Sequence, residues 1–219
     1  MKKILLMTVL AVVLGISTAN AGPVFYNTGV DNSGNQLSGG SSDPHYMLRQ
    51  VTSGTFVGDS NWAPAVAMGA SIIWPEWSKP ADARWIYIAD AANLGQDWGT
   101  YEFKTTFDLT GYDPSTAVLS GNWALDQYGS MSLNGSLIAT LPDGNWNSHL
   151  NPFTINSGFA AGINTLTFDV RFPDGGDGMI VSGASLTAVP TAVPEPSTLL
   201  LLGSGLVGLA GLGWRRNRQ

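Results

Sequence analysis

Tyr101-Glu-Phe-Lys-Thr-Thr-Phe-Asp-Leu109 alternates between one set of side chains that is mostly large and apolar and a second set that is polar. Successive side chains of a β-strand point to opposite faces of a sheet, so this alternation predicts a half-buried strand. Its inward face is expected to carry Tyr101, Phe103, Thr105, Phe107 and Leu109, and its outward face Glu102, Lys104, Thr106 and Asp108. Asn164-Thr-Leu-Thr-Phe-Asp-Val-Arg-Phe172 repeats the pattern, and its predicted inward residues are Leu166, Phe168, Val170 and Phe172.

Further short strands are predicted on both sides of these two. Residues 117–125 have the composition of a strand, and residues 131–141 form a hairpin that turns at Asn134-Gly135, a strong type I′ signal. Residues 153–155 and 179–186 supply two more strands. Short strands separated by Gly, Pro, Asn and Asp turns are typical of an antiparallel β-sandwich, so the fold class is all-β. Residues 22–100 show a weaker strand pattern and are expected to give the first strands and long loops of the same sandwich. Helical periodicity is confined to the two ends of the chain.

Four sequence elements in the second half of the chain occur in a recognisable order. They are Thr106-Phe-Asp-Leu-Thr-Gly111, Leu119-Ser-Gly-Asn-Trp-Ala-Leu-Asp126, Leu133-Asn-Gly135 and Gly162-Ile-Asn-Thr-Leu-Thr-Phe168. With these elements, residues 101–188 resemble the jelly-roll sandwiches of the galactose-binding-domain-like group. The resemblance implies a jelly-roll-like β-sandwich, a fold that hosts glycan binding as well as plain structural modules, so it does not fix a function.

The charges of the chain are unevenly distributed. Residues 22–193 contain fifteen Asp and Glu but only five basic residues, which are Arg49, Lys79, Arg84, Lys104 and Arg171. A body with this acidic excess is not expected to bind nucleic acid, because phosphate binding needs a basic face. The chain has no cysteine, so disulfides, zinc–thiolate sites and thiol nucleophiles are excluded.

The N-terminus has the pattern of a secretory signal peptide. Lys2 and Lys3 precede an apolar run over residues 4–16, and the small residues Ala19-Asn20-Ala21 follow it. This order of a positive region, a short apolar region and an A-x-A site predicts cleavage after Ala21, with Gly22 as the first residue of the mature chain. The expected partners of this segment are the export machinery and signal peptidase.

The C-terminus combines a rigid spacer, an apolar run and a basic end. Pro194-Glu195-Pro196 favours extended backbone, because proline fixes φ and restricts the residue before it. Residues 197–214 carry no charged side chain and would span about 27 Å as a helix, close to the thickness of the bilayer core. Arg215, Arg216 and Arg218 follow and are expected to hold the end of the chain in the cytoplasm. The sequence therefore predicts a single transmembrane helix over 197–214; a plain C-terminal anchor is the alternative to a processed signal.

Residues 193–219 resemble the PEP-CTERM sorting signal of Gram-negative bacteria, because the Pro-Glu-Pro box, the apolar run and the arginine cluster occur in that order. The resemblance implies recognition by an exosortase, a membrane-embedded cysteine protease-transpeptidase that cuts near the box. It also implies a species that makes extracellular polysaccharide. In this interpretation Pro194, Glu195 and Pro196 form a substrate motif, and they are not catalytic residues of this protein.

Patterns typical of catalysis or metal binding are missing from the sequence. His45 and His149 are far apart and lack a metal-ligand spacing, and no nucleophile elbow or P-loop occurs. No carboxylate pair stands out as a glycosidase pair would. Asp174-Gly-Gly-Asp-Gly178 could coordinate calcium, but a turn between two strands explains the same residues and is favoured. We therefore expect no catalytic residue, no metal site and no cofactor.

Tryptophan supplies the candidate ligand contacts. Trp74 and Trp77 lie in one proline-containing loop, where their rings could stack on sugar faces or cover an end of the core. Trp123 lies in the middle of a predicted strand and is assigned to the core.

These observations predict five segments in chain order. They are a signal peptide (1–21), a β-sandwich domain (22–188), an extended linker with the Pro-Glu-Pro box (189–196), a transmembrane helix (197–214) and a basic cytoplasmic tail (215–219). The expected function is that of an exported, non-enzymatic protein of the cell surface or exopolysaccharide, anchored transiently in the inner membrane and processed by an exosortase. The alternatives are a carbohydrate-binding module for the matrix polysaccharide and a secreted hydrolase.

Overall fold

The computed structural model describes most of the body of the chain and part of its C-terminal segment. The described residues are 22–51, 61–71, 73, 75–87, 99–142, 149–172, 178–191, 203–209 and 213–214, without the side chain of Phe172. The predicted signal peptide, 1–21, lies outside them.

Ten strands of the described residues form one antiparallel sheet. In chain order they are β1 (Ser42–Gln50), β2 (Ala63–Ala67), β3 (Ile86–Tyr87), β4 (Gly99–Asp108), β5 (Tyr112–Leu125), β6 (Tyr128–Leu133), β7 (Ser136–Leu141), β8 (Asn151–Ile155), β9 (Ile163–Phe172) and β10 (Met179–Pro190). Their order in the sheet is β7-β6-β9-β4-β1-β2-β3-β10-β5-β8. The prediction of an all-β, antiparallel body is therefore confirmed, and the strands predicted between residues 101 and 186 are all present.

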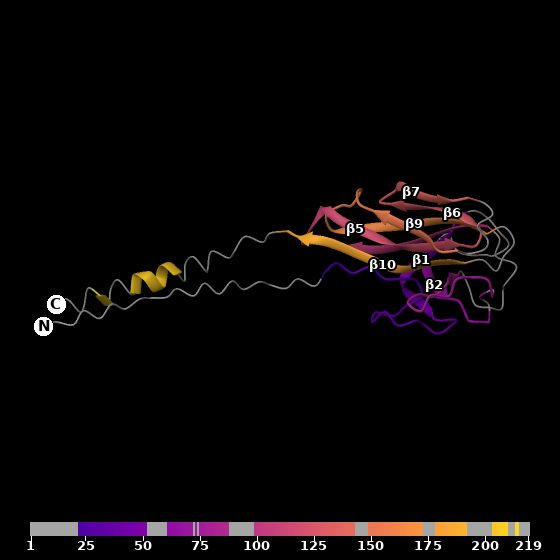
Figure 1. The fold of residues 1–219 in the computed structure, drawn as a ribbon, viewed down its shortest axis with the longest axis horizontal. Helices are drawn as coiled ribbons and strands as arrows, with labels where there is room; N and C mark the ends of the chain where they lie inside the picture. The colour runs from indigo at the N-terminus through magenta and orange to yellow at the C-terminus, as the bar shows by residue number, and fades with distance from the viewer. Residues whose placement is uncertain are drawn as a thin grey trace.

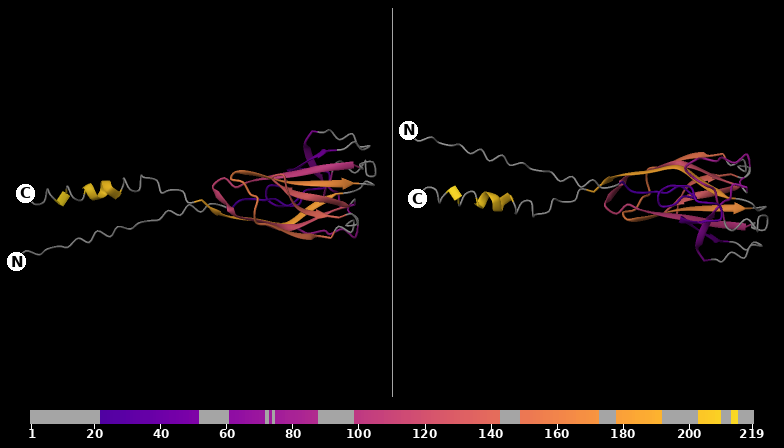
Figure 2. Two further views of the ribbon diagram at one scale, coloured as in Figure 1. Left: turned by 90° about the horizontal axis from the view of Figure 1, so that it is seen from above. Right: turned by 90° about the horizontal axis from the view of Figure 1, so that it is seen from below.

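The sheet curls back on itself so that its inner face encloses the core. Figure 2 shows the strands in two facing layers, which converge toward the end where β10 finishes. Trp123 of β5 packs against Phe168 of β9, with ring centroids 5.9 Å apart, although six positions separate these strands in the sheet order. Only a nearly closed sheet brings these two faces into contact, and the hydrogen bonding is continuous from β7 to β8. The finer jelly-roll connectivity stays a prediction.

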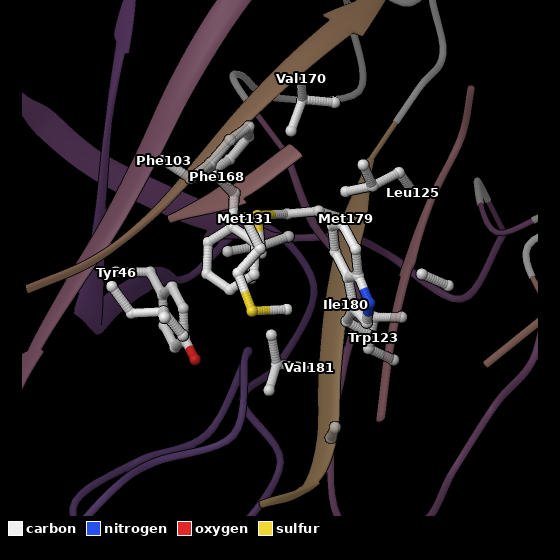
Figure 3. Close-up of a cluster of buried hydrophobic side chains, with 14 of the residues drawn as sticks. Tyr46, Phe103, Trp123, Leu125, Met131, Phe168, Val170, Met179, Ile180 and Val181 are labelled. Atoms are coloured by element: carbon white, nitrogen blue, oxygen red, sulfur yellow. The ribbon is translucent and has the colours of Figure 1, made fainter. Parts of the chain in front are cut away.

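The inward residues expected from the alternation are buried, apart from Phe172, whose side chain lies outside the described part of the chain. Tyr101, Phe103, Thr105, Phe107 and Leu109 are between 0% and 4% exposed, and Leu166, Phe168 and Val170 are fully buried. Figure 3 shows how the two layers meet: Phe103, Phe168 and Met131 face Trp123 and Val181. Burying large apolar side chains of this kind contributes about 1.5–3 kcal/mol each and is the main stabilisation of the fold.

The hairpin between β6 and β7 turns where the sequence predicts it. Asn134 has φ 49° and Gly135 has φ 81°, as a type I′ turn requires. Asn134 Nδ2 also donates to Asn164 Oδ1 at 2.8 Å, while Asn164 Nδ2 donates to the carbonyls of Ala160 and Gly162. Asn164 is completely buried, so these bonds satisfy a side chain that would otherwise be costly to bury. They join the turn to the start of β9.

The first part of the chain contributes to the same sheet, as predicted. β1 pairs with β4 through Leu48 and Phe103, and β3 pairs with β10 through Ile86 and Met179. The segment before β1 lies along β10, because Thr28 N donates to Val181 O at 3.1 Å and Val181 N donates to Thr28 Oγ1 at 3.0 Å.

The end of β10 is firmly attached to the body. The backbone N and the Oγ1 of Thr191 both donate to Gly111 O, at 2.9 and 3.1 Å. Figure 1 shows the arrowhead of β10 at one end of the body. The described part of the body therefore extends to Thr191.

Part of the predicted transmembrane segment is described. Residues 203–209 and 213–214 are helical. No helix in the described part of the chain has the length and apolar character needed to cross a membrane.

Candidate functional site

The outer face of β1, β4, β9 and β6 carries polar side chains in cross-strand rows. Arg49, Glu102, Asp169 and Ser130 are paired from strand to strand and form one row. Lys104 and Thr167 belong to the row on one side, and Arg171 and Tyr128 to the row on the other. These residues point outward because their neighbours along each strand, such as Phe103 and Val170, are fully buried inside. We call this surface the Trp62 face, and define it as Trp62, Arg49, Glu102, Lys104, Tyr128, Ser130, Thr167, Asp169 and Arg171.

Trp62 lies at one edge of this face and contacts two cations. Lys104 Nζ is 3.8 Å from the centre of the indole, and Arg49 Cζ is 4.8 Å from it. Trp62 directly precedes β2, which pairs with β1, so the β1–β2 ladder positions the ring next to Arg49. Cation–π contacts at a partly exposed site are worth about 0.5–1 kcal/mol each, and they fix the orientation of an aromatic ring that remains half-buried.

Two carboxylates lie in the middle of the face. Glu102 forms an ion pair with Arg49, whose Nε donates to Glu102 Oε2 at 2.6 Å. Asp169 is directly opposite Glu102 in the β4–β9 ladder. Partial burial raises the pKa of Asp169, and the negative charge of Glu102 raises it further, whereas Arg49 and a hydrogen bond with Ser130 act in the opposite direction. The two carboxylates therefore interact through space, and Arg49 stabilises the pair.

The Trp62 face concentrates the few cations of the body. Arg49, Lys104 and Arg171 are three of the five basic residues between 22 and 193. Arg171 is exposed and lies over the ring of Tyr128, with Cζ 5.6 Å from its centre. The remaining two cations bind backbone carbonyls elsewhere: Lys79 donates to Pro75 O, and Arg84 to Leu37 O. With three cations and two carboxylates, the face has a net positive charge, whereas the body around it is acidic.

Of the two tryptophans predicted as glycan contacts, only Trp77 lies in the described part of the chain, and it is buried. Trp74 lies outside the described residues. Trp77 is only 3% exposed, and its ring packs on Trp85 with centroids 4.3 Å apart. Trp85 Nε1 in turn donates to Ser78 O at 2.8 Å, which ties the loop to the core. The structure therefore assigns Trp77 to the core in place of the predicted glycan contact, while Trp123 is buried as expected.

The histidines are not brought together. The ring of His45 stacks on Tyr26, with centroids 3.6 Å apart, and its backbone N donates to the buried Asp43. Burial raises the pKa of Asp43, although bonds from three backbone N–H groups, led by that of Gly29, act against this shift. His149 is exposed and lies two residues before β8 begins. Within the described ranges no three His, Asp or Glu side chains are close enough to hold a metal ion, and residues 174–177 of the possible calcium loop lie outside those ranges.

The predicted processing motifs lie mostly beyond the described residues. This applies to Ala19, Ala21, Pro194, Glu195, Pro196, Arg215, Arg216 and Arg218. Gly22 is the first described residue and is exposed. Thr191 is the last described residue of the body, so the Pro-Glu-Pro box starts three residues after a point that is fixed by two hydrogen bonds.

Sequence reasoning missed the Trp62 face, although part of its signal was present. The alternation of residues 101–109 assigns Glu102 and Lys104 to the outer surface, and the repeat at 164–172 does the same for Asp169 and Arg171. No local pattern links these residues to one another or to Trp62, because the β4–β9 register and the β1–β2 ladder bring them together.

Comparison with known proteins identifies the tail. Residues 192–218 match the family described as the PEP-CTERM protein-sorting motif, which confirms the predicted sorting signal. The motif implies exosortase as the processing partner, together with export and a membrane-anchored precursor. No curated protein matches the chain in sequence.

Two solved structures show a weak likeness to the body. A family 35 carbohydrate-binding module from an environmental isolate has 13% identity and a TM-score of 0.34, covering 67% of this chain and 98% of the module. The GH31 α-xylosidase of Xanthomonas citri has 12% identity and a TM-score of 0.30, covering 78% of this chain and 18% of the xylosidase. Both TM-scores are too low for either likeness to carry an argument about this chain.

Proposed function

Because the chain carries a PEP-CTERM protein-sorting motif, we propose that it is an exported, non-enzymatic protein that an exosortase processes and delivers to the cell surface or extracellular matrix of a Gram-negative bacterium. The motif at residues 192–218 is the observation that carries this proposal. In this view the predicted signal peptide directs export, and the precursor is held in the inner membrane by residues 197–214 until it is processed.

The structure of the body is compatible with processing close to its surface. Thr191 is fixed to Gly111, and Glu195 follows four residues later. An extended chain advances at most about 3.6 Å per residue, so Glu195 lies within roughly 14 Å of Thr191. The large apolar side chains described beyond the box are exposed rather than packed on the body; they are Leu206, Val207, Leu209 and Trp214, which are 60–73% exposed. Such a segment gains by transfer to a lipid phase.

We assign no catalytic role to the opposed carboxylates, Glu102 and Asp169. A retaining glycosidase needs one carboxylate free to act as nucleophile and the other as acid. Glu102 is instead engaged by Arg49 in an ion pair, and both groups lie on the outer face of a sheet. This pair therefore gives no support to a secreted hydrolase, which stays an alternative.

A second function, carbohydrate binding, is favoured by the Trp62 face. It combines a partly exposed indole with fixed charges and with the hydroxyls of Ser130 and Thr167. Binding sites for polar ligands pair apolar or aromatic surface with a few convergent polar groups. The protein would then attach to the extracellular polysaccharide of the matrix to which it is delivered.

The sorting proposal is tested by changing Pro194, Glu195 and Pro196 together to alanine. A protease substrate needs an extended backbone, and the prolines preset one with little entropy to lose, so the triple variant is expected to enter the membrane but remain mostly as full-length precursor. The measurement is an immunoblot of membrane and surface fractions in a host that has the exosortase.

Val189→Ala, at an exposed position of β10 that precedes the motif, serves as the control and is expected to be processed like wild type. Neutral replacements of Arg215, Arg216 and Arg218 are expected to disturb orientation instead. If the triple-alanine protein is trimmed and released like wild type, the tail is a plain anchor and the sorting proposal fails.

The carbohydrate-binding proposal predicts that Trp62→Ala weakens retention on a polysaccharide panel. Truncation removes the indole contact surface, and loss of an aromatic contact at a binding site costs about 1–3 kcal/mol, or roughly fivefold to 150-fold in affinity. Affinity electrophoresis in gels that contain each polysaccharide measures the effect. Trp214→Ala, a tryptophan outside the body, is the control; equal retention of wild type and Trp62→Ala would contradict the proposal.

A further inference from the structure

We propose that the Trp62 face binds an acidic polysaccharide, one whose sugar units carry carboxylates, and that Lys104 and Arg171 supply its anion contacts. This inference rests on the proposed carbohydrate-binding function and adds the chemical class of the ligand. Two properties of the basic side chains support the inference: their positions on the body, and whether each already forms an ion pair with a carboxylate.

The first argument is charge placement. Residues 22–193 have ten more acidic than basic residues, yet three of the five basic side chains lie on this single face. A polyanion is repelled by the rest of the body and attracted where cations cluster, so the field of the whole protein guides it to this surface. A neutral glycan would need no such concentration.

The second argument is the state of those cations. Among the described residues the ion pair on this face joins Arg49 and Glu102. Lys104 and Arg171 instead lie over the rings of Trp62 and Tyr128, at 3.8 and 5.6 Å from the ring centres. A ring holds a cation in place without cancelling its charge, so both remain able to pair with a ligand carboxylate. Charge-assisted hydrogen bonds of this kind are about twice as strong as neutral ones.

The third argument is the extent of the face. The two cation–aromatic pairs lie on different strands: Lys104 belongs to β4 and Trp62 directly precedes β2, whereas Arg171 and Tyr128 belong to β9 and β6. Four neighbouring strands, β6-β9-β4-β1, span roughly 14 Å at about 4.8 Å between strands. A surface of this width contacts more than one sugar unit, which suits a chain polymer with spaced charges.

Glu102 and Asp169 between the cations explain why the polymer is a polysaccharide and not a nucleic acid. Double-stranded DNA presents a charge about every 1.7 Å, so any pose across this face would press phosphates against these carboxylates. An acidic polysaccharide carries at most about one charge for each sugar, and its hydroxyls can donate to Glu102 and Asp169. The row of mixed charges therefore favours a polymer whose negative charges are widely spaced and whose hydroxyls can donate hydrogen bonds.

The experiment measures binding of the full-length chain to polygalacturonate, with neutral dextran and double-stranded DNA as comparison probes. The double variant Lys104→Gln with Arg171→Gln is expected to bind polygalacturonate at least tenfold more weakly, and wild-type binding is expected to fall as salt rises, because exposed charges are screened. Lys79→Gln removes a cation away from the face and is expected to change binding less than twofold. Far-UV circular dichroism confirms that each variant is folded.

Each result supports or overturns the inference. Unchanged polygalacturonate binding in the double variant overturns it. Binding of dextran that Trp62→Ala weakens and the double variant does not would leave carbohydrate binding standing but remove the acidic class. Equal binding of DNA, weakened in parallel by the double variant, would show general attraction of polyanions and also overturns the inference. If no polysaccharide binds the wild type, the proposed carbohydrate-binding function fails together with it.

Discussion

Trp123→Ala is expected to lower the free energy of unfolding by about 3–5 kcal/mol, the usual cost of truncating a buried aromatic side chain. Trp123 is 1% exposed and is the largest side chain of β5 that packs between the layers. Its ring lies 5.9 Å from Phe168 in the opposite layer, and the backbone on either side pairs with β10 and β8. Both ladders hold the backbone in place, so the layers cannot collapse into the space that the indole leaves.

The size of this effect follows from the nearly closed sheet. Domains of this kind have a total stability of about 5–15 kcal/mol, so one such cavity removes a large fraction of it. Urea unfolding followed by far-UV circular dichroism measures the change without relying on tryptophan fluorescence. Leu137→Ala on the edge strand β7, where the side chain is 66% exposed, is the control and is expected to cost less than about 0.5 kcal/mol. A loss below 1 kcal/mol for Trp123→Ala would contradict the contact between the two layers.

Gly129→Ala is expected to be similarly severe, about 3 kcal/mol or more, although it adds only one methyl group. A Cβ at position 129 would lie 2.1 Å from the carbonyl oxygen of Asp169 and 2.9 Å from Leu125 Cδ1. The carbonyl belongs to the backbone of β9, which is paired on one side with β4 and on the other with β6. It cannot yield, so the β6–β7 hairpin must move away from β9 and lose part of its ladder.

Gly34→Ala is the control for Gly129→Ala, because it introduces backbone strain without a steric clash. Gly34 has φ 81°, which disfavours alanine, but no atom lies within 4 Å of its would-be Cβ. It is expected to cost only about 1 kcal/mol from the left-handed conformation. Thermal unfolding of both variants measures the difference. If Gly129→Ala is no more destabilising than Gly34→Ala, the close approach of β6 to β9 is not as the structure shows it.

The local features of the fold were predictable from the sequence. The alternation of residues 101–109 gives both the strand and its buried face, because the period of side chains along a strand is two residues wherever the strand lies. Asn134-Gly135 gives the turn, because few residues other than these tolerate positive φ at both central positions.

The tail was also identified from the sequence alone. An exosortase signal is a linear order of a proline box, an apolar run and arginines, and a linear motif needs no tertiary contact to be recognised. Strands β1 to β3 had weaker signals: β3 has only two residues, and its pairing with Met179 joins positions more than ninety residues apart.

Sequence alone therefore determined the all-β class, the strands from 101 onward and the sorting motif, all of which depend on the order of residues along one continuous stretch of chain. The tertiary structure decided which tryptophan is in the core and which is at the surface: Trp77 packs on Trp85, whereas Trp62 lies over Lys104 and Arg49. It also decided that three scattered cations share one face, since that depends on the register between strands far apart in the chain. Periodicity fixes the direction of a side chain relative to its own strand, but only pairing between strands fixes its neighbours.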